Sequence, residues 1–355
     1  MTKANTVDSG NNALNSADLL IELGCEELPP KSLSNIGQTL FSGFLDQLRK
    51  AELTFDADKS RVYYTPRRLA LLISGVAAGQ PDQVLNRKGP ALTAAYDADK
   101  QPTPAASGFA RSVGKSVDEL DTLKTDAGEW LFCQVTKPGQ TLDVLLLPML
   151  QKALAALPVA KPMRWASHDF SFIRPVHWLV IMHGSRVLDG SLFGLNAGNT
   201  TRGHRIHSPG PHEIPTACDY EKVLEDAYVL ADQGKRQEVI RNQVETLGKT
   251  TGGKALISDS LLAEVTNLVE WPRSICGSFD KEFLSVPAEA LIASMQDHQK
   301  FFPVVSKDQG LLINRFIAVA NLDSQNFDAV REGFERVIRP RLSDARFFWD
   351  QDNKS

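Results

Sequence analysis

The sequence predicts an α+β fold in which strands and helices are mixed, and three observations support this class. The chain opens with a strand, a helix and two further strands. Residues 176–183 are apolar on both faces, as expected for a central strand of a sheet. Several amphipathic helices and one hairpin follow after residue 215. With 355 residues, the chain can form two domains, or one large domain with an insertion.

The N-terminal elements are predicted from apolar spacing and from prolines. Residues 1–17 are polar and are expected to form a disordered tail. A short apolar strand at 19–23 precedes a helix at 30–50, which begins at a proline and carries apolar residues three and four positions apart. Two strands at 61–65 and 67–76 follow, separated by a Thr-Pro pair.

The composition then shifts toward small residues, glycine and proline, and we interpret about 88–140 as a small inserted module. It is expected to contain a short helix at 104–113 and a strand at 129–135. Asp97 and Asp99 suggest a calcium loop, but a lysine and two prolines follow where further ligands should stand. A plain turn is therefore predicted there.

The strand at 176–183 is preceded by a helix at 142–157, kinked or started at Pro148. A second extended piece is expected at 200–206, inside a loop bounded by glycines. We place these elements in one α/β region, residues 18–214, into which the module is inserted.

Residues 215–355 are predicted to form a helical region with a β-hairpin, and no glycine closes the last helix, which suggests a fragment of something longer. The pattern predicts helices at 220–226, 232–247, 258–269 and 287–296, a short strand at 227–230, a hairpin of 301–305 with 311–320, and a last helix from 327 that is interrupted at Pro340.

Charge, cysteines and hydropathy exclude several classes of protein. A net charge of −4 argues against a generally basic nucleic-acid coat, although a local basic face suffices to attract phosphate. The four cysteines are widely spaced, which fits neither a zinc ribbon nor a disulfide framework. Neither a secretory signal nor an apolar run near the ~20 residues of a membrane span is visible. We therefore expect a cytoplasmic protein without a membrane partner.

Residues 161–212 are rich in basic side chains, although the chain as a whole carries a negative net charge. Six of the seven histidines and six basic residues fall there, against two aspartates. His177 and His183 would lie about 20 Å apart along a strand, and His204 and His207 lie in a loop without a carboxylate set. No metal site is therefore predicted.

The loop after residue 200 supplies the candidate contact residues. Guanidinium and imidazole groups are chemically suited to phosphate, so RNA or a protein partner is one interpretation. The other is a solvated loop, or ion pairs with the acidic segments at 26–27 and 221–226, and the sequence leaves both open. The candidates are Arg202, His204, Arg205 and His207.

Residues 248–254 match the phosphate-loop pattern G-x-x-x-x-G-K, but the context is wrong. Ala255 stands where Ser or Thr would reach magnesium, and a helix rather than a strand precedes the motif. We expect a helix terminator that carries lysines. The sequence contains no G-x-S-x-G, H-E-x-x-H or G-x-G-x-x-G motif, so no catalytic residues are predicted.

Several blocks of the sequence, in order, resemble the β subunit of bacterial glycyl-tRNA synthetase. They include IELGCEELPPKSL, YTPRRLALLISG, MRWASHDFSFIRPVHWLV and TTRGHRIHSP, and further blocks lie at 87–114, 287–304 and 336–352. The β subunit of that family is much longer, so this chain would correspond to its N-terminal half.

The resemblance implies the function and the partners. In that family two α and two β chains form the ligase that attaches glycine to tRNA-Gly. The α subunit carries the catalytic core and uses ATP and Mg, so no cofactor is expected in this chain. The N-terminal part of β is similar to the B3/B4 region of the phenylalanyl-tRNA synthetase β subunit. The resemblance thus implies a non-catalytic half that binds tRNA-Gly and the α subunit, with no DNA partner.

Two alternatives remain. One is an editing-type hydrolase of mischarged tRNA, and the other is a plain RNA- or partner-binding module. Glycine is the smallest amino acid, so its competitors are larger and are excluded sterically at the first site. We therefore expect this chain to keep the B3/B4-like fold but not the editing activity.

Overall fold

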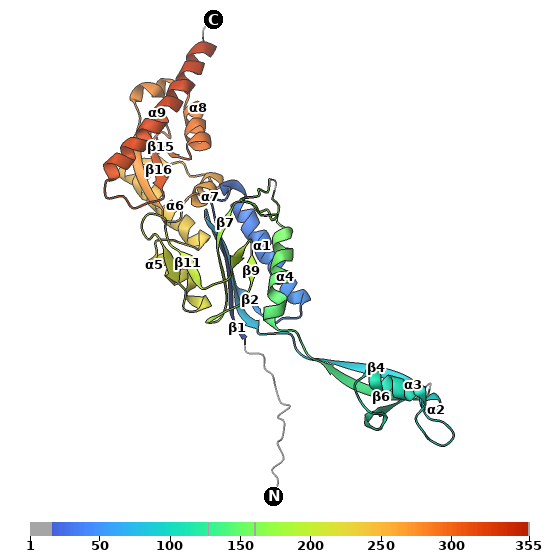
Figure 1. The fold of residues 1–355 in the computed structure, drawn as a ribbon. Helices are drawn as coiled ribbons and strands as arrows, with labels where there is room; N and C mark the ends of the chain where they lie inside the picture. Colours follow the sequence, from blue (N-terminus) through green and yellow to red (C-terminus); the bar gives the residue numbers. More distant parts are fainter. Residues whose placement is uncertain (1–15, 127, 160, 354–355) are drawn as a thin grey trace. The chain divides into compact units, whose positions relative to one another are not determined.

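The computed structural model describes residues 16–126, 128–159 and 161–353, which form a mixture of helices and strands (Figure 1). This confirms the predicted fold class. The described residues divide into two compact units: one comprises 51–53 and 77–146, and the other comprises 16–50, 54–76 and 147–353. The predicted tail lies outside the described residues except for its last two positions, which begin the first strand.

The larger unit contains a five-stranded sheet in the order β2-β3-β1-β7-β8. β7, the strand expected to be central, lies inside this sheet and pairs antiparallel with β1, so that Glu22 stands opposite Val180. The strands are β1 (Ser16–Cys25), β2 (Asp56–Thr65), β3 (Arg68–Ala77), β7 (Val176–His183) and β8 (Arg186–Val187).

Helices cover both faces of this sheet. α1 (Pro30–Lys50) packs closely on β2, because a Cβ at Gly37 would lie 2.5 Å from the ring of Tyr64. The neighbouring Tyr63 points to the opposite face, where Trp178 and its neighbours on β7 pack against α5 (Tyr220–Asp226). Successive side chains of these strands are therefore buried on both sides, which explains the unbroken apolar pattern of β7.

A second, four-stranded sheet of the same unit has the order β13-β15-β16-β14. β15 (Phe302–Ser306) and β16 (Leu312–Ala320) form the predicted hairpin, while β14 (Arg273–Ser278) was not predicted. The sheet also includes β13 (Gly253–Ala255). α6 (Gln233–Thr250) begins as predicted, because the Asp232 carboxylate accepts a hydrogen bond from the Lys235 amide.

Two predictions about this region are wrong. α9 (Phe327–Asp352) continues through Pro340, since Ile338 and Leu342 on either side are buried in a shared core cluster. Residues 227–230 form no strand, because Tyr228 takes a left-handed conformation and the Leu230 amide bonds outside any ladder, to Glu270. α8 (Ala288–Ala293) passes directly into a π-helix at Ser294–His298, so the helix predicted at 287–296 is present with a change of winding after Ala293.

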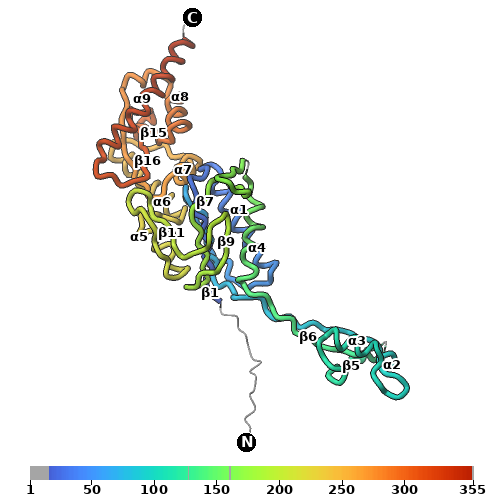
Figure 2. Tube along the Cα trace, in the orientation of Figure 1, coloured from blue at the N-terminus to red at the C-terminus, as the bar shows by residue number. Residues whose placement is uncertain are grey.

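The smaller unit, whose Cα trace is drawn in Figure 2, is built on a three-stranded sheet in the order β4-β6-β5. Its small core contains Ala95, Ala106 and Leu131, and Asp97 closes the predicted turn by accepting amide hydrogen bonds. The unit begins at residue 77, whereas the composition shift begins near 88. Its elements are β4 (Gln83–Ala91), α2 (Leu92–Ala95), α3 (Pro104–Ser112), β5 (Asp121–Thr125) and β6 (Gly128–Lys137).

The remaining elements are short, apart from one helix. Among the described residues, no helix is long and apolar enough to cross a membrane. The expected extended piece after residue 200 is a strand of three residues only. These elements are α4 (Leu142–Ala155), β9 (Ser191–Leu192), β10 (Leu195–Asn196), β11 (Thr200–Arg202), β12 (Pro211–Glu213) and α7 (Asp259–Thr266).

Candidate functional site

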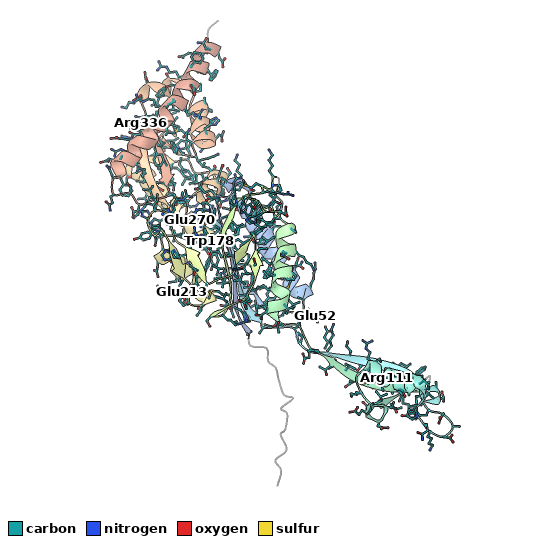
Figure 3. All side chains as sticks on the ribbon, viewed as in Figure 1. Glu52, Arg111, Trp178, Glu213, Glu270 and Arg336 are labelled. Atoms are coloured by element: carbon teal, nitrogen blue, oxygen red, sulfur yellow. The ribbon has the colours of Figure 1, made fainter. Side chains whose placement is uncertain are left out.

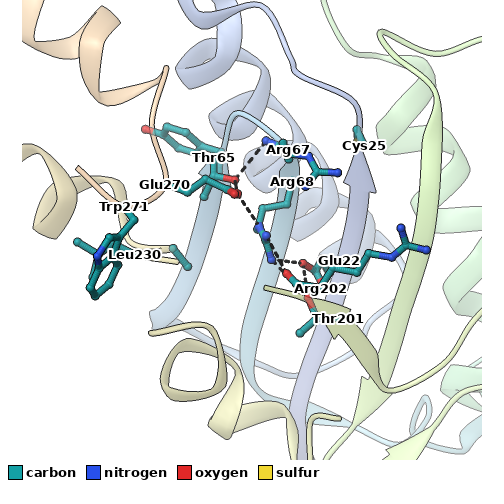
Figure 4. A network of polar contacts seen from close by, with 12 residues as sticks. Glu22, Cys25, Thr65, Arg67, Arg68, Thr201, Arg202, Leu230, Glu270 and Trp271 are labelled. Atoms are coloured by element: carbon teal, nitrogen blue, oxygen red, sulfur yellow. Dashed lines mark hydrogen bonds and ion pairs between the residues drawn. The ribbon is translucent and has the colours of Figure 1, made fainter. Parts of the chain in front are cut away.

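A buried charge network joins the five-stranded sheet of the larger unit to the segment before β14, and Arg68 is its centre (Figure 4). The Arg68 guanidinium approaches Glu22 Oε1 at 3.1 Å and Glu270 Oε1 at 3.2 Å, and it donates to the Arg202 carbonyl oxygen at 2.9 Å. All three ionisable side chains are at most 1% exposed. Arg68 therefore ties β1 and β3 to β11 and to the segment before β14.

Hydroxyl groups complete most of this network. Thr65 donates to Glu270 at 2.6 Å, and Thr201 and Tyr220 donate to the same oxygen of Glu22 at 2.9 and 3.2 Å. Burial raises the pKa of Glu22, and Arg68 offsets this only in part. Burial also opposes ionisation of Glu270, but Arg68 and Thr65 outweigh it and leave the pKa of that carboxyl below its usual value. Glu270 is therefore the better-compensated carboxylate.

Trp178 lies next to this network, and three arginine side chains lie near its ring. The guanidinium carbons of Arg202, Arg68 and Arg67 lie 5.4, 5.6 and 5.9 Å from the ring centroid, within cation–π range. Gly24 leaves room for the indole, since a Cβ at that position would lie 1.8 Å from it. Figure 3 labels Trp178 and Glu270 among all the side chains.

A pocket of about 270 Å³ opens beside this tryptophan. Trp178 is 7% exposed, and its indole also interacts with the Glu22 carboxylate. The pocket wall also offers polar side chains that can donate hydrogen bonds, so it is suited to a small polar or anionic group. These are Asn196, Thr200 and Arg202, together with His177, whose Nε2 lies 3.0 Å from the Glu26 carboxylate.

The four residues predicted from sequence have different environments. Arg202 is exposed on β11 and lines the Trp178 pocket. Arg205 is also exposed, but its guanidinium lies 3.1 Å from the Glu27 carboxylate. That contact corresponds to the ion-pair interpretation of this loop. Arg202 is thus the one of the four that lines this pocket.

The two histidines fasten the loop to the chain that follows β16. His204 is fully buried, and its Nε2 lies 2.8 Å from the Asn321 carbonyl oxygen. His207 stacks on His204 with ring centroids 4.8 Å apart, and its Nε2 accepts a hydrogen bond from the Asp323 amide at 2.7 Å. Both imidazoles therefore have bonds within the protein.

The environment of His204 predicts a pH effect on stability. Burial is the main cause that lowers the pKa of His204. Because the unfolded chain then binds the proton more readily, the free energy of unfolding should decrease as the pH falls through about 6.5. We expect urea denaturation at pH 7.5 and 5.5 to show a larger loss for the wild type than for His204→Gln. Equal losses would contradict this assignment.

Glu22 and Glu270 were not found from the sequence, and neither was Arg68. A signal existed for Glu22, because a lone carboxylate stands within the apolar run LLIELGC. A charge inside a buried strand requires a partner. Arg68 directly follows another arginine and Glu270 stands two residues before a proline, so neither gives a comparable signal.

Among the described residues, no group of three His, Cys, Asp or Glu side chains can hold a metal ion. Cys25 is buried near the network, and burial raises the pKa of its thiol far above the usual value. Such a thiol stays protonated at neutral pH, so Cys25 is unsuited to act as a nucleophile.

Comparison with known proteins identifies the chain. A family model described as the glycyl-tRNA synthetase beta subunit matches residues 19–355. The chain is 46% identical over 342 residues to the glycine–tRNA ligase beta subunit of Hahella chejuensis, covering 96% of this chain and 49% of that protein. It is 47% identical over 339 residues to the corresponding subunit of Chromohalobacter salexigens, covering 96% of this chain and 49% of that protein.

These matches define the class as an aminoacyl-tRNA synthetase subunit. The chain belongs to the glycyl-tRNA synthetase beta subunit family. It spans about half the length of the curated relatives that it matches.

Proposed function

We propose that this chain is the tRNA-binding and assembly half of the β subunit of a cytoplasmic glycine–tRNA ligase. The α subunit would bind ATP and glycine and perform the ligation in an α2β2 complex, and this chain would contact α and tRNA-Gly. The observation that carries the proposal is the family match over residues 19–355. The bonded state of Glu22, Arg68 and Glu270 supports a structural rather than catalytic use of the buried charges.

The Trp178 pocket supports RNA contact near β11. Arg202 presents an exposed guanidinium there, and a guanidinium donates a planar fork of hydrogen bonds that matches phosphate oxygens. His177 and Asn196 add further polar groups on the same wall. Such a combination of cation and hydrogen-bond donors suits the backbone or a splayed nucleotide of an RNA.

Arg202→Gln should weaken the binding of tRNA-Gly about five- to tenfold, because one phosphate contact is lost while the exposed side chain contributes little to folding. The measurement is fluorescence anisotropy with labelled tRNA-Gly at several salt concentrations, together with the melting temperature. Arg205→Gln is the matched control, and its effect should be smaller because Arg205 is paired with Glu27. Equal affinities of Arg202→Gln and the wild type would count against this contact.

The division of labour is tested by reconstitution. With the α subunit, ATP, glycine and tRNA-Gly, the full-length β subunit should support aminoacylation, and this chain by itself, without α, should not. Aminoacylation by the isolated chain would overturn the proposal.

Editing is separated from binding by a deacylation assay. We expect no hydrolysis of mischarged tRNA-Gly by this chain. Hydrolysis that Arg202→Gln abolishes without lowering the melting temperature would favour the editing alternative instead.

A further inference from the structure

A second pocket, of about 560 Å³, lies in the larger unit where α6, β13 and the β15–β16 turn meet. Its volume falls within the range of small-molecule sites in proteins. We call it the lysine pocket. Its charged lining residues are Arg241, Glu245, Lys249, Lys254 and Lys307.

The charges of the lysine pocket are unbalanced. Lys249, Lys254 and Lys307 are exposed, and within the described part of the chain none of them forms an ion pair with a carboxylate. Arg241 does, at 3.1 Å from Asp259, and Glu245 contributes one negative charge. Three unpaired ammonium groups around one hollow create a positive potential that attracts anions.

The glycine-rich motif at 248–254 explains how the lysines come together. A Cβ at Gly248 would lie 2.8 Å from the Ala255 amide nitrogen, and one at Gly253 would lie 2.5 Å from the Val305 carbonyl oxygen. The glycines therefore allow the end of α6 and β13 to pack closely on their neighbours. Lys249 and Lys254, which flank this turn, consequently line the same pocket.

The sheet register brings in the third lysine. β13 pairs antiparallel with β15, so that Lys254 stands opposite Val305 and Gly253 opposite Ser306. Lys307 follows directly after that last pair, at the start of the hairpin turn. The order of elements is helix, turn and strand, which is unlike a phosphate loop, yet the motif still gathers lysines.

We propose that the lysine pocket binds phosphate groups of the tRNA backbone. This inference rests on the proposed function, that the chain binds tRNA-Gly, and assigns a site to it. Ammonium groups neutralise phosphates as point charges without selecting sequence, which suits a contact that positions a backbone. Leu256 and Ile257 provide an apolar part of the wall on which a sugar can rest. A free nucleotide triphosphate shares this chemistry, and the test distinguishes the two sources.

The test compares two triple variants of this chain in tRNA-Gly binding between 50 and 300 mM salt, a range over which the Debye length shortens by a factor of about 2.4. Lys249→Gln, Lys254→Gln and Lys307→Gln together should reduce the slope of log affinity against log salt by about two to three, since each lost phosphate contact removes about 0.7–0.9. The control neutralises three exposed lysines outside the pocket, at Lys31, Lys152 and Lys281, and should leave the slope unchanged.

A single variant gives the opposite sign. Glu245→Gln removes the one negative charge on the wall and should strengthen tRNA-Gly binding several-fold. A folding defect cannot imitate a gain of affinity. In addition, bound tRNA-Gly should protect Lys249, Lys254 and Lys307 from an amine-reactive reagent, while Lys152 should stay reactive.

The outcomes separate this inference from the proposed function. If the wild type binds tRNA-Gly and the pocket variant keeps its slope, the lysine pocket is not the contact, although the proposed function stands. If the wild type binds ATP but not tRNA-Gly, and the pocket variant no longer binds ATP, the pocket binds a free nucleotide. In that case the proposal that this chain binds tRNA-Gly is overturned. If the wild type binds neither, both are overturned.

Discussion

Arg68→Met should lower the free energy of unfolding by about 3–5 kcal/mol, because it leaves the buried carboxylates of Glu22 and Glu270 without their cation. Methionine fills a similar volume, so the loss arises mainly from uncompensated charge rather than from a cavity. The measurement is urea denaturation followed by tryptophan fluorescence, which reports on Trp178 beside the network.

The control for Arg68 is Lys222→Met. Lys222 forms a 3.2 Å ion pair with Asp226 on an exposed helical surface, and such pairs contribute less than about 1 kcal/mol. A loss for Arg68→Met as small as that of the control would show that the network is dispensable.

A second variant isolates the charge effect. Glu270→Gln in the Arg68→Met background neutralises one of the two carboxylates that have lost their cation. The double variant should therefore lose less free energy of unfolding than the sum of the two single losses. Strict additivity would mean that Arg68 and Glu270 are not coupled, contrary to their 3.2 Å contact.

Arg236→Met should have an effect of similar size, about 3–5 kcal/mol, by another mechanism. The Arg236 guanidinium is fully buried and donates to four carbonyl oxygens of the described residues, and burial lowers its pKa to about 10. Methionine would remove the shared donor of four carbonyl oxygens. They belong to Tyr64 at 2.9 Å, Thr266 at 3.0 Å, Leu230 at 2.5 Å and Ala231 at 3.2 Å.

The control lies next to it in the chain. Lys235 is exposed and pairs with Glu221, so Lys235→Met should change the unfolding free energy by less than about 1 kcal/mol. Arg236→Lys should recover part of the loss, because an ammonium keeps the charge but cannot reach all four carbonyls from one point. Equal stabilities of Arg236→Met and Lys235→Met would refute the role of Arg236 in joining β2 to the helices.

Much of the local structure follows from neighbouring residues alone. The spacing of apolar side chains from Leu33 to Leu48 predicts α1, and the apolar run of β7 predicts an interior strand. Asp232 predicts the start of α6 because its carboxylate can reach only an amide of the first turn. These features depend on contacts within a few residues, which the sequence states directly.

The candidate site was predicted less well, because exposure decides which side chains are available. Arg202 and His204 stand two residues apart with similar local signals, yet one is exposed at a pocket and the other is fully buried against Asn321. Asn321 lies 117 residues further along the chain, so the residues near His204 in the sequence do not predict this contact.

The same distinction separates what neighbouring residues determine from what tertiary structure decides. Local patterns and motifs of the sequence predict the class of fold, the main helices, the hairpin and the family. The pairing of Arg68 with Glu22, 46 residues away, and with Glu270, 202 residues away, depends on strand order and register. Arg236 belongs to a helix with a charged surface pattern, and only packing shows that it is buried. Burial and long-range pairing arise from the whole fold, and for that reason the charges that hold this protein together became visible only in three dimensions.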